Sequence, residues 1–320
     1  MRIATFAHDG GARAGVVVGD NLHPLPVGVT VTELIEQGTL LEAGRTAERQ
    51  PTALGNTVPL GSVHLLPPLT PPSIRDFVTF EEHIEGVARR FGDQIRPEWY
   101  EAPTFYFTNP HALIGAHDEV PVPPGCHAFD FELEVAAVIG RAGRDLTAEQ
   151  AREHIVAYTI FNDWSARDLQ AREMRVGLGP AKGKDSASTL GPWLVTADEL
   201  DDCRDADGFL DLTMTVARNG EKVGGDTLAN MAWTFEEMVA YASRGTWVRP
   251  GDVLASGTCG SGCLAELWGR HGTLNPVPLT PGDVVTMTVE RLGTISNTVT
   301  SGTTPVPVPR ARKKPGTGRW

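Results

Sequence analysis

Acidic, basic and amide side chains concentrate in residues 129–184. The segment 130–134 (DFELE) carries two glutamates, Glu132 and Glu134, separated by one residue. Side chains alternate along a strand, so both carboxylates would lie on one face. Two neighbouring carboxylates repel each other unless a positive charge lies between them, and a hard divalent cation meets that need. The pair therefore indicates a metal site, with a solvated edge strand as the simpler alternative.

A third carboxylate and three further polar side chains follow in the segments 162–170 (NDWSARDLQ) and 179–184 (GPAKGK). Asp163 comes at the end of a predicted strand, within reach of the glutamate pair. The cationic and amide donors that bind carboxylate and keto oxygens are also present: Arg167, Gln170 and Lys184. The whole set can hold a hard cation and bind an anionic substrate.

Two predicted helices position the remaining candidates. Residues 147–160 show helical spacing after a capping-box-like TAEQ, and a strand end at 158–161 delivers Asp163. Nearer the N-terminus, Asp76 precedes a helix that is predicted to begin at Thr79 and to carry His83. A capped helix with a surface histidine is the alternative for that stretch.

The rest of the chain is predicted to be rich in strands. Residues 1–68 combine short apolar runs with turn residues, which predicts a small β unit with one or two short helices over 30–49. Four prolines in 67–72 (PPLTPP) exclude helix and mark a predicted domain boundary. After residue 190, strands surround one clear helix over 231–243. A Gly-rich loop (CGSGC) follows the strand 250–258, and its backbone N–H groups could face an anion.

Composition excludes several function classes. The 320-residue chain has a net charge of −12, which argues against a nucleic-acid surface, and its only basic cluster lies in the C-terminal tail. No apolar run approaches the roughly 18–20 residues of a membrane helix, and no secretory segment is recognisable. The sequence thus predicts a cytoplasmic enzyme without membrane or nucleic-acid partners. The four scattered cysteines are expected to be free thiols, forming neither disulfides nor a zinc site.

Several separated motifs occur together in a fixed order. They are Asp76-Phe77 with His83 seven residues after the aspartate, DFELE at 130–134, NDWSARDLQ at 162–170, Gly183-Lys184, Ser256-Gly257-Thr258 and Glu266-Leu267. In order and spacing, the chain from about residue 75 to residue 299 resembles the fumarylacetoacetate hydrolase (fumarylacetoacetase) family. The resemblance implies an α+β, β-rich fold, a mixed β-sandwich roll with a small N-terminal β-rich domain. We expect the N-terminal domain at 1–68, the catalytic domain at 69–305 and a disordered Pro/basic tail at 306–320.

Carried over residue by residue, the resemblance implies a divalent-metal site with four ligands: Asp76, Glu132, Glu134 and Asp163. Carboxylate oxygens suit Mg²⁺ or Ca²⁺, and Mn²⁺ would also fit. His83 is implied as the general base that activates water, with Glu266 orienting its imidazole. Substrate binding is implied for four residues, of which the first three also stabilise developing charge: Arg167, Gln170, Lys184 and Thr258.

The resemblance implies a hydrolase acting on carbon–carbon bonds in ketonic substances, in which His83-activated water attacks a metal-chelated 1,3-diketone or acylpyruvate-type acid. A decarboxylase, dehydratase or isomerase acting on a 2-keto acid is the alternative within the superfamily, and a non-catalytic metal-stabilised dimer is a remote one. Val78 and Met174 replace tyrosines of the animal pattern, which counts against fumarylacetoacetate itself as substrate. Family members are commonly homodimers, so a homodimer is expected. The exact keto acid, the pathway and the physiological metal stay open.

Overall fold

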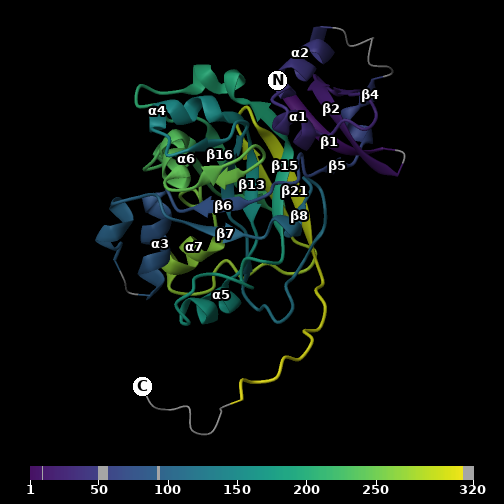
Figure 1. The fold of residues 1–320 in the computed structure, drawn as a ribbon. Coiled ribbons are helices and arrows are strands. Elements are labelled where there is room, and N and C mark those ends of the chain that lie inside the picture. Colours follow the sequence, from purple (N-terminus) through teal and green to yellow (C-terminus); the bar gives the residue numbers. More distant parts are fainter. Residues whose placement is uncertain (9, 50–56, 92–93, 313–320) are drawn as a thin grey trace.

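The fold is built on two β-sheets flanked by helices (Figure 1). The structure is a computed structural model that describes residues 1–8, 10–49, 57–91 and 94–312. In order across the larger sheet, the strands are β4 (Val58–Pro59), β3 (Asn21–Pro24), β2 (Gly11–Val18), β1 (Arg2–His8), β15 (Ser188–Thr196), β13 (Ile155–Asp163), β11 (Leu133–Ile139), β19 (Val253–Ala255), β6 (Ile74–Phe77) and β7 (Phe105–Thr108). Off this path, β5 (Leu65–Leu66) pairs with β1 and β8 (Leu113–Ile114) pairs with β15.

The second sheet packs against the first. Its strand order is β17 (Glu221–Thr227), β16 (Thr213–Arg218), β20 (Val284–Val289), β21 (Gly293–Thr300) and β9 (Val120–Pro121). Met214, Val216 and Met287 from this sheet share one buried core with Leu133 and Val135 of β11. Alternate residues of each strand supply this core, as expected for a sandwich. The predicted β-rich sandwich fold is confirmed. Two short pairs complete the strands: β10 (Phe129–Asp130) with β14 (Ser165–Ala166), and β12 (Gly143–Arg144) with β18 (Trp247–Val248).

The N-terminal strands extend the large sheet. β1 runs antiparallel to β15, with Arg2 opposite Val195. Helices α1 (Val31–Glu36) and α2 (Leu40–Arg49) lie at this end, and Thr30 caps α1 in a capping box with Glu33. This confirms the predicted short helices over 30–49. A second buried core includes Ile3 of β1 and residues of α1 together with the second face of β11. The domain boundary at residue 68 stays a prediction.

Within the described residues, five further α-helices surround the sheets: α3 (Glu81–Phe91), α4 (Ala148–Ala151), α5 (Arg167–Met174), α6 (Phe235–Ser243) and α7 (Leu264–His271). The helix predicted over 147–160 is longer than the observed one, so this prediction is wrong in its extent. Its capping box with Thr147 forms, but β13 already begins at Ile155 because this apolar run is buried between β11 and β15. Thr79 was also predicted to cap a helix; instead its hydroxyl donates to the carbonyl of Ser256 at 2.6 Å, and α3 begins at Glu81.

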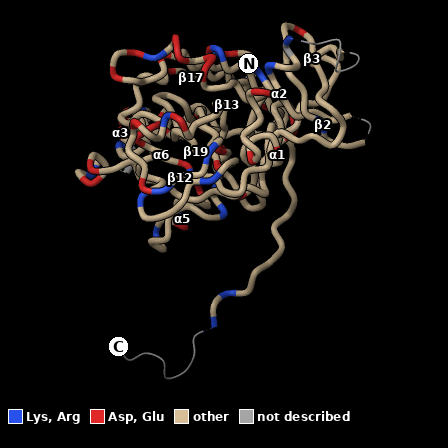
Figure 2. The backbone as a smooth tube through the Cα atoms, turned by 45° about the horizontal axis from the view of Figure 1, so that its top comes forward, with Lys and Arg blue, Asp and Glu red and all other residues tan. Residues whose placement is uncertain are grey.

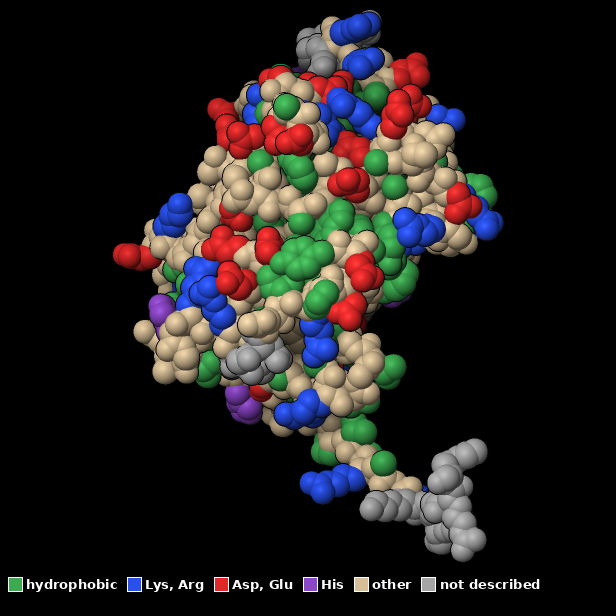
Figure 3. Space-filling model, turned by 90° about the vertical axis from the view of Figure 1, so that its left-hand side faces the viewer, with side chains coloured by type: hydrophobic (Ala, Val, Ile, Leu, Met, Phe, Trp, Pro, Cys, Tyr) green, Lys and Arg blue, Asp and Glu red, His purple; other side chains and the backbone are tan. Residues whose placement is uncertain are grey.

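Charged residues are spread along the chain (Figure 2), and their side chains are scattered over the face shown in Figure 3. On the face shown in Figure 3, acidic and basic groups alternate without forming a continuous basic patch. Arg310 and Arg312 lie on the stretch 301–312, which has no regular secondary structure and projects from the body (Figure 2). Lys313 and Lys314 of the same basic cluster lie outside the described residues. The helices in the described ranges are all too short or too polar to cross a membrane. All four cysteines are free, as predicted.

Candidate active site

Strand directions bring the predicted carboxylates to one end of the large sheet. β11 starts immediately after Glu132 and runs antiparallel to β13, whose last residue is Asp163. On its other side, β11 pairs with β19, which is parallel to β6 and places Asp76 beside Ala255. The chain therefore returns three times to the same sheet end, and each return delivers a carboxylate.

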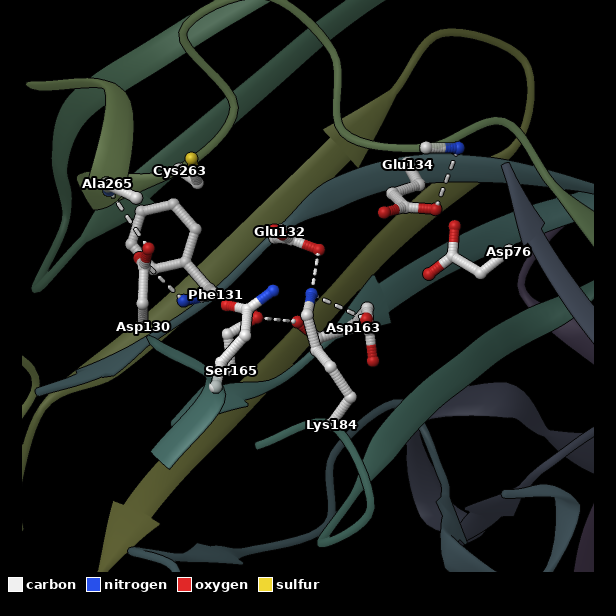
Figure 4. Close-up of polar contacts among 12 residues, drawn as sticks. Asp76, Asp130, Phe131, Glu132, Glu134, Asp163, Ser165, Lys184, Cys263 and Ala265 are labelled. Carbon is white, nitrogen blue, oxygen red and sulfur yellow. Dashed lines mark hydrogen bonds and ion pairs between the residues drawn. The ribbon is translucent and has the colours of Figure 1, made fainter. Parts of the chain in front are cut away.

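Three of these carboxylates form a compact buried group (Figure 4). Oxygen atoms of Asp76, Glu132 and Glu134 all lie within 4.8 Å of one another. Glu134 Oε2 accepts a hydrogen bond from the Gly257 N–H at 3.1 Å, but Glu134 Oε1 and Asp76 Oδ1 are buried without a hydrogen-bond partner. A buried polar atom without a partner is costly, and a cation bound by carboxylate oxygens would satisfy both. The donor set therefore fits a hard divalent cation.

Lys184 and Tyr106 connect Asp163 to this group. The buried Lys184 Nζ forms ion pairs with Asp163 Oδ2 at 2.7 Å and with Glu132 Oε2 (Figure 4). The Tyr106 hydroxyl donates to Asp76 Oδ2 at 2.9 Å and also to Asp163. Asp163 is thus joined to the other carboxylates through hydrogen-bonded neighbours, although it lies outside the group of three.

The pKa values of the cluster reflect burial and repulsion. Burial, followed by the charges of neighbouring carboxylates, raises the pKa of Asp76 and of Glu134 well above the ordinary value. Burial also raises the pKa of Asp163, although Lys184 opposes this. Glu132 behaves differently: burial opposes its ionisation, but the charges of Arg167 and Lys184 prevail and lower its pKa to about 2. Negative charge in the cluster is therefore incompletely balanced, which a bound cation would correct.

Asp130 fixes the predicted substrate arginine. Arg167 Nε donates to Asp130 Oδ2 at 2.9 Å, and Arg167 Nη1 pairs with Glu132 Oε1 at 2.7 Å. Gln170, on the next turn of α5, accepts a hydrogen bond from Arg167 Nη1 at 3.2 Å. Asp130 also accepts two backbone N–H groups from the first turn of α7, at 2.8 and 3.0 Å. One buried carboxylate thereby fixes the starts of both α5 and α7, a role that sequence reasoning missed.

The neighbouring helices α3 and α7 bring His83 and Glu266 together. His83 Nδ1 lies 2.8 Å from Glu266 Oε1, and both side chains are buried. The second oxygen, Glu266 Oε2, accepts from the Ser261 N–H at 2.8 Å and pairs with Arg270 at 3.2 Å. Gly86 permits this close approach, because a Cβ there would lie 3.0 Å from Glu266 Cγ. A fixed carboxylate at one imidazole nitrogen is what a general base needs for orientation.

Comparison with known proteins assigns the family. The family description "Fumarylacetoacetate (FAA) hydrolase C-terminal" matches residues 73–300, and "Rv2993c-like, N-terminal" matches residues 1–68. The chain belongs to the fumarylacetoacetate hydrolase family. Oxaloacetate tautomerase FAHD2A, mitochondrial, from Homo sapiens is 30% identical over 291 residues, which cover 89% of this chain and 84% of that protein. The family membership that the sequence motifs indicated is confirmed.

Two solved structures share the fold over nearly the whole chain. The fumarylacetoacetate hydrolase of Exiguobacterium antarcticum superposes with a TM-score of 0.74 at 27% identity, covering 94% of this chain and 99% of that one. The maleylpyruvate hydrolase of Sphingobium sp. SYK-6, solved with manganese(II) and pyruvate, has a TM-score of 0.71 at 23% identity and covers 95% and 100% of the two chains. The family thus includes hydrolases and a tautomerase, and one member of this fold binds a divalent metal.

In this family member, Lys184 follows a turn that Glu173 holds. The Glu173 carboxylate accepts hydrogen bonds from the backbone N–H groups of residues 181, 182 and 183 at 2.9, 2.9 and 3.0 Å. Gly183 packs closely on α5, since a Cβ there would lie 2.7 Å from Gln170 Cα. The turn and α5 therefore form one unit that presents Lys184 to the carboxylates. Nothing in the spacing of Glu173 signals this contact.

A pocket of about 360 Å³ borders two residues that contact the carboxylates. Tyr106 and Lys184 line it near the cluster, and Asn109, Lys182 and Asp185 also line it. Asn109 Nδ2 donates to Asp185 Oδ1 at 2.7 Å, and Lys182 pairs with the same carboxylate. The pocket wall therefore has its own polar groups beyond the predicted site residues.

Thr258 lies buried in the loop that joins β19 to α7. Its neighbour Gly257 donates to Glu134, so the loop borders the carboxylate group. A substrate contact of Thr258 stays a prediction. Met174, which replaces a tyrosine of the animal pattern, ends α5 with a side chain that is 53% exposed.

Proposed function

We propose that this chain is a metal-dependent hydrolase that cleaves a carbon–carbon bond in a small 1,3-diketone or acylpyruvate-type acid. The observation that carries the proposal is the 2.8 Å contact between His83 Nδ1 and Glu266 Oε1, next to a buried carboxylate cluster that Arg167 and Asp130 join to the start of α7. Hydrolysis requires a base that activates water, whereas keto–enol interconversion requires no water attack. The paired histidine and carboxylate can supply this base, which supports hydrolysis.

Four carboxylates would hold the cation: Asp76, Glu132, Glu134 and Asp163. The two unpartnered oxygens in this set support the assignment, as does the manganese(II) ion in the maleylpyruvate hydrolase structure. When bound, the cation would supply Lewis acidity toward carbonyl oxygens of the substrate. Mg²⁺, Ca²⁺ and Mn²⁺ all suit carboxylate ligands.

The chain's own residues would perform the proton transfers. His83 takes a proton from water at Nε2 while its Nδ1–H remains hydrogen-bonded to Glu266, which stabilises the imidazolium. Burial alone would lower the pKa of Lys184, but Asp163 and Glu132 raise it above its ordinary value. Lys184 therefore stays an ammonium and stabilises negative charge on substrate oxygens.

The substrate would enter through the pocket. A volume of about 360 Å³ suits an acid of small size. Arg167 and Gln170 would bind its oxygens at the start of α5, and Thr258 would bind a carboxylate or keto group from the opposite loop. Pyruvate in the maleylpyruvate hydrolase structure supports a keto acid as the ligand class.

Product analysis in ¹⁸O-labelled water tests the proposed function. The full chain is incubated with Mn²⁺ and an acylpyruvate, and the products are identified by mass spectrometry. Hydrolysis predicts two products, with solvent oxygen in the newly formed carboxylate and no reaction in EDTA. Enol–keto interconversion without cleavage or label would overturn the hydrolase proposal.

That contrary result would favour the second candidate, a tautomerase acting on a 2-keto acid. The observation behind it is the 30% identity to a human oxaloacetate tautomerase. Loss of enol absorbance from oxaloacetate, measured with and without the protein, would detect this activity. The homodimer and the cytoplasmic location remain predictions, which light scattering and cell fractionation would test.

A further inference from the structure

Cys263 adds a third potential ligand atom to the His83–Glu266 pair. Its Sγ lies 3.8 Å from His83 Nδ1 and 3.8 Å from Glu266 Oε1. All three residues are buried, and their ligand atoms lie within 4.8 Å of one another. The proposed mechanism uses the histidine and the glutamate but gives the thiol no role.

The surrounding structure holds these three atoms together. Cys263 immediately precedes α7 and Glu266 lies in its first turn, which Asp130 fixes through two backbone N–H groups. Glu266 Oε2 is engaged by Ser261 and Arg270, so Oε1 is the oxygen that faces His83 and Cys263. The backbone and hydrogen bonds around these three side chains therefore fix the positions of their ligand atoms.

The ligand types and distances suit Zn²⁺. Tetrahedral zinc with bonds of about 2.3 Å to sulfur and about 2.0–2.2 Å to nitrogen and oxygen places its ligand atoms roughly 3.3–3.6 Å apart. The two separations from Cys263 Sγ are close to this range, and the 2.8 Å between His83 Nδ1 and Glu266 Oε1 would open by roughly half an ångström. A thiolate and a carboxylate together neutralise a divalent ion, which favours binding inside a buried site. Mg²⁺ and Ca²⁺ prefer oxygen ligands and would not compete well here.

We propose that Cys263, His83 and Glu266 form a second metal site, selective for Zn²⁺ and ions of similar softness, whose occupation inhibits the enzyme. Binding releases one proton to solvent, from the Cys263 thiol, while the neutral His83 imidazole keeps its single proton, which moves from Nδ1 to Nε2 when Nδ1 binds the metal. An imidazole bound to metal through Nδ1 keeps its remaining proton on Nε2, so it cannot accept a proton from water. The inhibition rests on the proposed function, but the metal site itself does not.

This site is separate from the carboxylate cluster. Figure 4 places Cys263 beside Asp130, on the opposite side of Glu132 from Asp76 and Glu134. Burial raises the pKa of the Cys263 thiol, so the metal-free protein keeps this sulfur protonated. The cysteine spacing predicts no zinc site because the histidine ligand lies 180 residues away in the chain.

Cobalt(II) titration of the metal-free full chain tests the site without any assay of turnover. Thiolate ligation of Co²⁺ gives a sulfur-to-metal charge-transfer band, which the all-oxygen cluster cannot produce. Wild type and Cys259→Ser should show this band, and Cys263→Ser and Cys263→Ala should lack it. Cys259 is the matched control because it is also a buried free thiol. Absence of the band from wild type, or its survival in both Cys263 variants, would overturn the proposal.

Inhibition by Zn²⁺ tests whether occupation of the second metal site lowers enzyme activity. Activity is measured with Mn²⁺ at saturation, so that the carboxylate cluster is already occupied, and each variant is compared with its own zinc-free rate. Loss of a residue that only hydrogen-bonds to a metal ligand weakens metal binding about 10–100-fold. Cys263 is proposed as a ligand itself, so Cys263→Ser should need at least about ten times more Zn²⁺ for half inhibition. Equal zinc sensitivity of wild type and Cys263→Ser would refute the inhibitory role. Failure of the proposed function would instead appear as no turnover with an intact cobalt band.

Discussion

Tyr106 lies opposite Asp76 in the pairing of β7 with β6, and its hydroxyl donates to Asp76 Oδ2 at 2.9 Å. The same hydroxyl also donates to Asp163, so it shares one proton between two proposed metal ligands. Burial and the adjacent carboxylates raise the pKa of Tyr106 well above its ordinary value, which keeps the phenol protonated as a donor. Tyr106 thus orients the cluster without carrying charge.

Tyr106→Phe should weaken Mn²⁺ binding about 10–100-fold, because it removes the donor that orients two ligand carboxylates. Isothermal titration calorimetry measures the change. Tyr100→Phe is the matched control, since Tyr100 is 53% exposed and bonds to Glu81 at the surface. Unchanged Mn²⁺ affinity in the Tyr106 variant would show that the hydroxyl does not orient the ligands.

Glu134→Gln should affect the stability of the metal-free protein and of the Mn²⁺-bound protein differently. Without metal, the variant loses a repelled buried carboxylate, so its Tm should equal or exceed that of wild type. Mn²⁺ at 100 times its Kd should stabilise wild type by about 2.7 kcal/mol and the variant by much less. Differential scanning calorimetry with and without Mn²⁺ gives both values.

Glu236→Gln is the control for the Glu134 experiment. Glu236 is a buried carboxylate that pairs with Arg204 at 2.8 Å, outside the carboxylate cluster. Its substitution should lower Tm by the same amount with and without metal. A Glu134→Gln protein that kept the full Mn²⁺ response would exclude Glu134 as a ligand.

Glu173→Ala should lower kcat about 10–100-fold, because displacement of a charged group by about 1 Å is enough for such a loss. The three backbone N–H groups that Glu173 holds precede Lys184 directly. Tm should change little, since Glu173 is only half-buried. Glu153→Ala is the control, with a side chain 79% exposed. Wild-type kcat in Glu173→Ala would mean that the turn keeps its shape without the carboxylate.

Asp283 should make stability depend on acid pH. It accepts from Arg218 Nη2 at 2.6 Å and from the Thr280 N–H at 2.7 Å, and these donors lower its pKa despite burial. A lowered native pKa gives stability that is present above the ordinary aspartate pKa of about 3.9 and is lost as the pH falls below it. Urea unfolding of wild type and Asp283→Asn from about pH 7 to about pH 3 should therefore show a difference that shrinks toward acid. Parallel curves would contradict this.

The local parts of the site could be predicted because they lie within short motifs. Glu132 directly precedes β11 and Glu134 lies two residues later, and Gln170 follows Arg167 by one turn of α5. Tyr106 could not be predicted in the same way, because its partner depends on which strands pair. The contact of Cys263 with His83 joins residues 180 positions apart, and no spacing rule specifies it.

The fold was predicted in class but not in all its elements. Turn-separated apolar runs gave the β-rich character, because strand length and turn residues are local properties. The run at 155–163 was misassigned in part, since a fully buried strand lacks the alternation that distinguishes it from a helix. The joining of β1 to β15, in which Ile3 pairs with Leu194 across 190 intervening residues, could not follow from local patterns.

His83→Ala with saturating Mn²⁺ tests the central claim most directly. A general base contributes about 10²–10⁴-fold to the rate, so kcat for acylpyruvate cleavage should fall at least that far. Mn²⁺ affinity, measured by calorimetry on the same sample, should remain at the wild-type value because His83 is not among the four carboxylate ligands proposed for that ion. Retention of wild-type kcat, or loss of Mn²⁺ binding together with activity, would contradict the account.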